Sequence, residues 1–243
     1  MVTKKDIKFI NSLKQKKYRN NNNCFIVEGK KSIREFIDSN YKLLKLYSID
    51  CSFFHDIDNQ FQIDYQLLKK ISFLNNPDDH IAVFELKGVK PIENDNLIIA
   101  LESIRDPGNL GTIIRTCEWF GIKDIICSLD SVDCYNQKVI QAAMGSISRI
   151  NITYVDLKEY LKRSKNVLIG TSLNGKSLYK YHKDFNKCVL IFGNEANGIS
   201  DQLLKITDFN LTIPRFNNCE YPESLNIASS LSVFLGEIKS RSF

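Results

Sequence analysis

The feature that most constrains the fold is a repeated alternation of short apolar runs with segments of helical periodicity. The run at residues 97–101 (LIIAL) is continuously apolar, as expected of a strand that is buried on both faces. Between helical segments or turns, further apolar runs recur at residues 125–127, 152–154, 167–170, 188–192 and 210–213. Because strands that alternate with helices form parallel sheets, the sequence predicts an α/β fold with a mainly parallel sheet.

A polar stretch divides the chain into two predicted domains. Residues 87–96 (KGVKPIENDN) hold a glycine, a proline and mostly polar side chains, which are typical of a linker. The shorter part before it also alternates, with expected helices at 4–17, 33–37 and 67–73, a loop at the asparagine run 20–23, and strands at 24–27, 43–49 and 81–84. We therefore predict a small α/β domain over residues 1–88 and a second domain over residues 89–243.

Positive charge is concentrated at the start of the chain. Residues 1–90 hold 16 of the 33 lysines and arginines and 11 of the 28 acidic residues, a net charge of +5, whereas the remainder is neutral. A basic cluster of this kind suits a polyanion such as RNA, although a solvated helix face has the same composition. The candidate RNA-binding residues are Lys4, Lys5, Lys8, Lys14, Lys16, Lys17 and Arg19.

Other compositional features exclude several classes of protein. No apolar run is long enough to cross a bilayer and no signal peptide precedes the first helix, so we expect a soluble cytoplasmic protein. The seven cysteines form no CxxC pair and lie mostly in apolar stretches, which favours buried free thiols over disulfides. The three histidines show no ligand spacing, and no metal site is predicted.

The first cluster of chemically useful residues is 102–116 (ESIRDPGNLGTIIRT), directly after a predicted strand. Asn109 is suited to cap a helix expected over residues 110–120. Gly111 and Arg115 are four residues apart and share one helix face. Gly111 lets a ligand come close to the helix backbone, and Arg115 could then bind a phosphate or a ribose hydroxyl of that ligand. A capped helix with a surface arginine would show the same residues.

Two further clusters also follow predicted strands. Residues 190–200 (LIFGNEANGIS) form a glycine- and asparagine-rich loop that exposes backbone donors and acceptors. In residues 211–228 (LTIPRFNNCEYPESLNIA), Ser224 to Asn226 are expected to begin a final helix over residues 224–240, whose N-terminus offers free N–H donors. Each cluster alone would also fit an ordinary loop or a capped helix.

Taken in order, the patterns NxGxxxRT, GNExxG and IP…ESLN resemble the three motifs of SPOUT methyltransferases, and more narrowly the TrmH/SpoU branch, which methylates the ribose 2′-hydroxyl of RNA. The resemblance covers about residues 97–240 and includes the intervening segment AAMGSISRINI. FIVEGKKSIREF (residues 25–36) resembles the L30e-like substrate-binding domain of many members. The resemblance implies a deep trefoil knot, S-adenosylmethionine as cofactor, and a homodimer that pairs at the knot.

The resemblance also implies roles for individual residues. Arg115 would bind the ribose hydroxyl and stabilise the developing alkoxide, because an arginine normally keeps its proton and is a poor general base. Its orientation, and that of the ribose, would depend on Asn109, Glu195, Ser224 and Asn226. The cofactor would lie against the backbone of Gly193, Ile213 and Leu225, with Thr171, Leu173, Asn194 and Gly198 nearby.

One departure from the family and several alternatives bear on this interpretation. Residues 215–222 (RFNNCEYP) are longer than the usual turn of the family and contain no glycine. This difference affects the expected shape of the cofactor pocket and the expected contact of Ile213 with the cofactor.

A Rossmann-type methyltransferase is disfavoured because ESIRDPGN, not a glycine-rich loop, follows the strand 97–101. A base-methylating SPOUT enzyme would not be expected to show NxGxxxR. Ribosomal RNA is the preferred substrate; transfer RNA, or a non-catalytic RNA-binding assembly factor, is the alternative.

Overall fold

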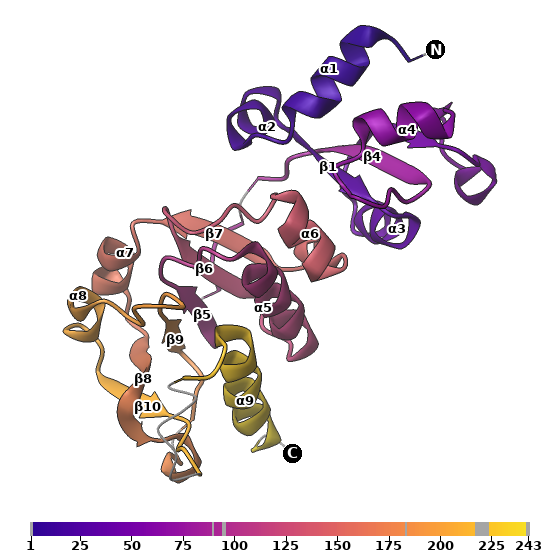
Figure 1. Ribbon diagram of the computed structural model, residues 1–243. Coiled ribbons are helices and arrows are strands. Elements are labelled where there is room, and N and C mark those ends of the chain that lie inside the picture. Colours follow the sequence, from indigo (N-terminus) through magenta and orange to yellow (C-terminus); the bar gives the residue numbers. More distant parts are fainter. Residues whose placement is uncertain (1, 89, 94–95, 183, 217–223, 242–243) are drawn as a thin grey trace. The chain divides into compact units, whose positions relative to one another are not determined.

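A computed structural model describes residues 2–88, 90–93, 96–182, 184–216 and 224–241 of the protein (Figure 1). The chain divides into two compact units, one of Met1–Gly88 with Asp133–Ser148 and one of Val89–Val132 with Arg149–Phe243. The segment Asp133–Ser148, which the sequence analysis places in the second domain, therefore packs with the first unit. Over the described ranges, no helix combines the length and the apolar character that a membrane span requires.

The first unit is a four-stranded mixed sheet with helices. The sheet has the order β1-β4-β2-β3, in which β4 is antiparallel to β1 and β2, and β3 is parallel to β2. Short 3₁₀ helices at Ser52–Phe54 and Ser146–Ser148 complete the unit. Its other elements are α1 (Lys4–Ser12), α2 (Lys16–Asn22), β1 (Cys24–Glu28), α3 (Lys30–Asp38), β2 (Leu43–Ser48), β3 (Gln60–Gln62), α4 (Tyr65–Ile71), β4 (His80–Glu85) and α6 (Gln137–Ala143).

The N-terminal helical region differs from the single helix that the periodicity predicts. A capping box between Thr3 and Asp6 starts α1, which ends at Ser12, and α2 begins only at Lys16. The asparagine run is helical as far as Asn22, and Asn23 ends the helix in the left-handed region with φ of 51°. Asparagine tolerates this backbone geometry, so the run acts as a C-terminal cap and the predicted loop was wrong.

The core of the first unit is built on β1, all five residues of which are buried. The ring of Phe25 contacts the rings of Phe36, Phe84 and Tyr135, with centroids 5.4, 6.0 and 4.4 Å away. Since Tyr135 lies in the segment 133–148, these aromatic contacts explain why that segment packs with the first unit.

The second unit contains a six-stranded sheet in which every pair of neighbouring strands is parallel. This arrangement confirms the predicted α/β class with a mainly parallel sheet. The strand order is β10-β8-β9-β5-β6-β7. The elements are β5 (Ile98–Leu101), α5 (Pro107–Trp119), β6 (Asp124–Ser128), β7 (Asn151–Val155), α7 (Leu157–Arg163), β8 (Val167–Ser177), a 3₁₀ helix (Leu178–Lys180), β9 (Cys188–Phe192), α8 (Asp201–Leu204), β10 (Phe209–Thr212) and α9 (Ile227–Ser240).

Helices cover both faces of this sheet, which explains why its central strands are continuously apolar. On one face, Leu157 and Leu161 of α7 and Leu203 of α8 pack against alternate strand residues such as Ile126 and Ile191. On the other face lie α5 and α9, which pack side by side (Figure 1). Burial of strands on both faces is the usual condition of an all-parallel sheet.

The strand order places two loops together at the carboxyl edge of the sheet. From β5 the chain proceeds outward through β6 and β7, and then crosses to the other side, where β9 pairs with β5. Leu101 is in register with Phe192, and the N–H of Glu102 donates to the carbonyl of Phe192 at 2.9 Å. The β5–α5 and β9–α8 loops are therefore neighbours at a topological switch point, where open α/β sheets bind their ligands.

Candidate active site

The start of α5 differs from the sequence expectation in one useful way. Asp106, not Asn109, is the N-cap: its side chain accepts from the N–H of Asn109 at 2.8 Å, and Pro107 occupies the first helical turn. Proline at this position lacks only a donor that has no helical partner. Because the cap is provided elsewhere, the side-chain amide of Asn109 is available for other hydrogen bonds.

The carboxylate of Glu195 fastens the β9–α8 loop to the start of α5. Its Oε1 accepts from Asn109 Nδ2 at 3.1 Å and from the N–H of Asp106 at 3.3 Å. Its Oε2 accepts from the N–H of Arg105 at 3.4 Å and from Asn194 Nδ2 at 3.3 Å. Four donors thus converge on one carboxylate, which determines the position of the β5–α5 loop relative to the β9–α8 loop.

Asn226 brings the third motif into the same network. The structure starts the final helix at Ile227, so Asn226 is its N-cap, with Oδ1 accepting from the N–H groups of Ala228 and Ser229 at 2.9 and 3.3 Å. Its Nδ2 donates to Asn109 Oδ1 at 2.9 Å. The predicted helix start at residue 224 was therefore wrong, and Leu225 lies before the helix and is exposed.

The β9–α8 loop closes on itself through its backbone. The N–H of Asn194 donates to the carbonyl of Gly198 at 2.9 Å, and the N–H of Gly198 donates back to Asn194 at 2.8 Å. A Cβ atom on Gly193 would lie 2.0 Å from the carbonyl carbon of Gly198, so only glycine fits there. Gly198 has φ of 66°, a conformation that also favours glycine. Both glycines are thus required by the shape of the loop.

The remaining predicted cofactor residues lie in β8, directly after β10 and directly before the N-cap of α9. Strand β8 is longer than expected, and Thr171 and Leu173 lie in its extension, with Thr171 Oγ1 donating to the carbonyl of Ile191 at 2.9 Å. Ile213 directly follows β10. Leu173 and Leu225 are 68% and 50% exposed, which is unusual for leucine. Residues 217–222 of the long segment 215–222 lie outside the described residues.

The structure does not join Arg115 and Ser224 to this network. Both are exposed, and among the described residues neither forms a hydrogen bond with Asn109, Glu195 or Asn226. Arg115 lies six residues after Asn109 on α5, a rise of about 9 Å along the helix axis.

The basic residues near the N-terminus fall into two groups. The lysines are exposed, as RNA binding would require; they are Lys4, Lys5, Lys8, Lys14, Lys16 and Lys17. Arg19 is 4% exposed, and its guanidinium pairs with Asp133 and donates to the carbonyls of Leu13 and Lys14 at 2.9 and 3.0 Å. These contacts occupy Arg19 within the first unit, so its burial does not fit the expected contact with RNA.

Several residues at the edge of the sheet were not anticipated from the sequence. Glu102 Oε2 accepts from the N–H of Ser200, the N-cap residue of α8, at 2.8 Å. Arg105 forms an ion pair with Asp130 at 2.7 Å. The only sequence signal for these residues is their position directly after a strand. In the described part of the chain, no group of histidine, cysteine or acidic side chains is arranged to hold a metal ion.

Comparison with known proteins accords with this geometry. The chain matches the substrate-binding domain described as MRM3-like over residues 4–82. It is 26% identical over 234 residues to the Bacillus subtilis 23S rRNA (guanosine(2553)-2′-O)-methyltransferase RlmP, covering 93% of each chain. It is also 26% identical over 174 residues to the 23S rRNA (guanosine-2′-O-)-methyltransferase RlmB of Neisseria meningitidis, covering 70% of this chain and 67% of the relative.

Solved structures share the whole architecture. A TrmH-family structure from Porphyromonas gingivalis is 30% identical, with a TM-score of 0.89 and coverage of 99% of both chains. An AdoMet-bound rRNA methyltransferase from Sinorhizobium meliloti is 25% identical, with a TM-score of 0.86 and coverage of 100% of this chain and 97% of the other. The profile of the SpoU rRNA Methylase family matches residues 96–236, more than half of the chain. The protein therefore belongs to the SpoU rRNA methylase family.

Proposed function

We propose that the protein transfers a methyl group from S-adenosylmethionine to a ribose 2′-hydroxyl in ribosomal RNA. The observation that carries this proposal is the hydrogen-bonded chain Asn226–Asn109–Glu195, which unites three motifs from distant parts of the sequence at one sheet edge. The names of the curated relatives support ribose methylation of 23S rRNA. We also propose a cytoplasmic location, as expected of a bacterial ribosomal RNA methyltransferase such as these relatives.

The extension of β8 and the segments after β9 and β10 are the proposed cofactor site. The exposed leucines Leu173 and Leu225 suit the apolar faces of an adenine ring, and backbone groups at Gly193 and Ile213 suit its polar edges and the ribose. Thr171, Asn194 and Gly198 belong to the same proposed site. When bound, S-adenosylmethionine supplies an electrophilic methyl group on a sulfonium.

The chain must then position the ribose and stabilise the charge that develops on its oxygen. We assign this task to Arg115, whose guanidinium is permanently charged and can contact both the 2′-oxygen and a neighbouring phosphate. Asn109 is held by Glu195 and Asn226, and Ser224 lies beside that network in sequence. A rigid amide network at the start of α5 reduces the orientational freedom of the reacting groups, which accelerates an in-line transfer.

Substrate RNA would first be captured by the basic N-terminal part of the chain. We propose residues 1–88 as the substrate-binding domain and residues 89–243 as the catalytic domain. The family match to a substrate-binding domain and the net charge of +5 in residues 1–90 support this division. The exposed lysines of α1 and α2 are the proposed contacts, and Arg19 is left out because it is buried.

We further propose a homodimer formed through the second unit. The single tryptophan, Trp119, is 86% exposed on α5, next to the packed pair α5 and α9. A tryptophan left in water is a strong candidate for burial in an interface, because burying its ring is favourable. Light scattering on the native protein should give about 56 kDa for a dimer, twice the chain mass of 28.0 kDa, and Trp119→Ser should shift the equilibrium toward monomer.

The proposed role of Arg115 is tested by Arg115→Ala. We expect loss of tritiated methyl transfer to ribosomal RNA, with binding of S-adenosylmethionine retained in calorimetry. Arg163→Ala removes an exposed arginine from the end of α7 and serves as the matched control. Turnover close to that of the wild type in Arg115→Ala would contradict the role.

A further inference from the structure

Helices α1 and α4 form one continuous surface on the first unit. Ile10 and Leu13 of α1 and Leu68 of α4 belong to the same buried cluster, so the two helices pack against each other. Asn11 Nδ2 donates to the carbonyl of Lys70 at 3.1 Å, which joins the C-terminal halves of both helices. Their outward faces are therefore adjacent and held in a defined relationship.

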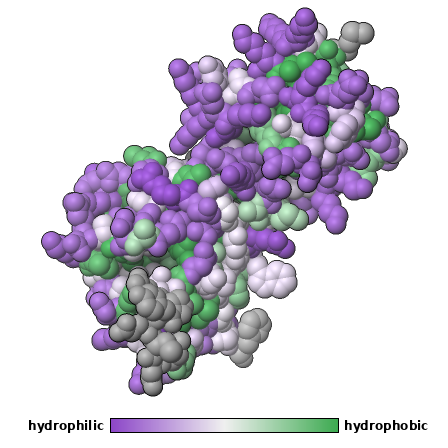
Figure 2. Space-filling model, in the orientation of Figure 1, coloured by the Kyte–Doolittle hydropathy of each residue, from purple (hydrophilic) through white to green (hydrophobic). Residues whose placement is uncertain are grey.

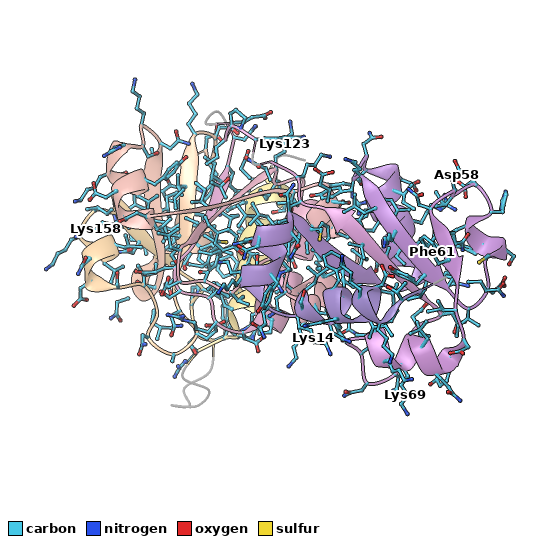
Figure 3. The ribbon with its side chains drawn as sticks, turned by 90° about the horizontal axis from the view of Figure 1, so that it is seen from above. Lys14, Asp58, Phe61, Lys69, Lys123 and Lys158 are labelled. Carbon is cyan, nitrogen blue, oxygen red and sulfur yellow. The ribbon has the colours of Figure 1, made fainter. Side chains whose placement is uncertain are left out.

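This outward surface carries positive charge almost without compensation. We name it the α1–α4 surface and define it by six exposed lysines: Lys4, Lys5, Lys8, Lys14, Lys69 and Lys70. Asp6, the acidic residue of α1, is bound by Lys45 Nζ at 2.7 Å and by Thr3. The carboxylate of Asp64 caps the opposite end of α4 through the N–H of Leu67. Figure 3 labels Lys14 and Lys69, which extend from the first unit, and Figure 2 shows a largely hydrophilic face on this part of the protein.

The surface is suited to phosphate groups and not to base edges. Lysine ammonium groups are point charges on flexible stems, which neutralise phosphates without the planar geometry needed to read a base. Phe73 is half-buried and lies under Lys14, with Nζ 4.7 Å from the ring centroid, whereas Tyr65 at the start of α4 is 55% exposed. An array of exposed lysines on two packed helices is typical of contact with a nucleic acid backbone.

We propose that the α1–α4 surface binds the phosphate backbone of the RNA substrate, and that Lys69 and Lys70 contribute contacts to it as well as its four lysines within residues 4–14. The inference rests on the proposed function, because that function makes RNA the substrate. It adds a second helix to the RNA-binding surface.

The chain contains a matched control for this proposal. Lys30 and Lys31 form an identical exposed Lys-Lys pair in α3, but their surroundings are acidic. Lys30 lies close to Asp50, and Arg34 in the same helix pairs with Asp56 at 3.2 Å. Removing either pair of lysines changes the net charge of the chain by the same amount, so a general electrostatic effect would be equal for both.

The experiment compares Lys69→Gln/Lys70→Gln with Lys30→Gln/Lys31→Gln in the full chain. Binding to protein-free 23S ribosomal RNA is measured at several KCl concentrations. For the α4 pair we expect affinity to fall about tenfold or more at low salt, and the slope of log K against log [KCl] to shrink by about 1.4 to 1.8, as for two lost phosphate contacts. The α3 pair should change the affinity by less than about twofold and leave the salt slope unchanged.

Equal losses of affinity from both lysine pairs, or no loss from the α4 pair, would overturn the proposal. Tighter binding of the protein to phosphatidylglycerol vesicles than to RNA at the same ionic strength would also overturn it.

A methyl-transfer assay separates failure of this proposal from failure of the proposed function. The α4 variant should raise KM for RNA and leave kcat unchanged. A wild-type protein that transfers no methyl group, but still shows the contrast in RNA binding, would refute the proposed activity and retain the surface.

Discussion

The side-chain amide of Asn226 donates to Asn109 Oδ1 at 2.9 Å and so links two residues that are 117 positions apart. The same amide caps α9 through its oxygen, which accepts from the N–H groups of Ala228 and Ser229. One side chain therefore caps the final helix and also holds a residue in the first turn of α5. This double use explains how folding of the C-terminal helix assembles the candidate site.

The two uses of Asn226 can be separated by substitution. Asn226→Asp retains an N-cap acceptor but cannot donate to Asn109, whereas Asn226→Ala loses both. We expect Asn226→Ala to lower the free energy of unfolding by about 1 kcal/mol, and Asn226→Asp to change it little. Both should reduce kcat for methyl transfer at least about tenfold, equivalent to about 1.4 kcal/mol in activation free energy. Denaturant melts and single-turnover assays measure the two effects. Full activity in Asn226→Asp would show that only the cap matters.

Glu195→Gln tests whether the carboxylate organises the loops. Each carboxylate oxygen accepts two hydrogen bonds, and the amide of glutamine would place a donor against two of these donors. We expect kcat/KM to fall about tenfold with little change in melting temperature, since the side chain is exposed. Glu159→Gln on α7 is an exposed control that should retain full activity. Unchanged kinetics in Glu195→Gln would refute the organising role.

Gly193→Ala should damage the cofactor site through sterics alone. The added Cβ would lie 2.0 Å from backbone of Gly198, so the loop must move, whereas a Cβ on Gly88 would meet nothing within 4 Å. We expect affinity for S-adenosylmethionine to fall at least about tenfold in Gly193→Ala, equivalent to about 1.4 kcal/mol. Gly88→Ala should bind normally. Calorimetry measures both, and wild-type affinity in Gly193→Ala would exclude the loop from the site.

The cysteines should react in an order set by burial. The six described cysteines are free thiols, of which five are buried and Cys51 is half-buried. Burial raises the pKa of Cys24 and Cys188 to about 11, so their thiolate fraction is small at neutral pH and increases as the pH rises toward that value. At pH 8 we expect alkylation of both to be about a hundredfold slower than in the unfolded chain. Peptide mapping by mass spectrometry measures the rates, and rapid labelling of Cys24 in folded protein would contradict its burial.

The parts of the fold that follow from local periodicity could be predicted from the sequence. The apolar run 97–101 and its counterparts are strands of a parallel sheet, and β9 has the predicted bounds Cys188–Phe192. The ends of helices were less predictable, because Asp106 and Asn109 are equally good caps in isolation. Only the contact of Asn109 with Glu195 and Asn226 decides between them.

Long-range contacts set the remaining limits. Charge alone suggested Arg19 as an RNA contact, but a partner 114 residues away, Asp133, accounts for its burial. The position of residues 133–148 in the first unit depends on such long-range contacts, including that of Tyr135 with Phe25. No local sequence pattern predicts these contacts. The trefoil knot, the L30e-like fold and the dimer remain predictions of the family resemblance.

Ribose methylation itself is tested most directly by mapping resistance to alkaline cleavage along ribosomal RNA. A 2′-O-methyl group removes the internal nucleophile, so a methylated position resists hydrolysis. After incubation of unmodified 23S ribosomal RNA with the protein and S-adenosylmethionine, we predict a new resistant position, absent when Arg115→Ala replaces the wild type. Methyl incorporation that leaves every ribose sensitive to alkali, or no incorporation by the wild-type protein, would contradict the proposed function.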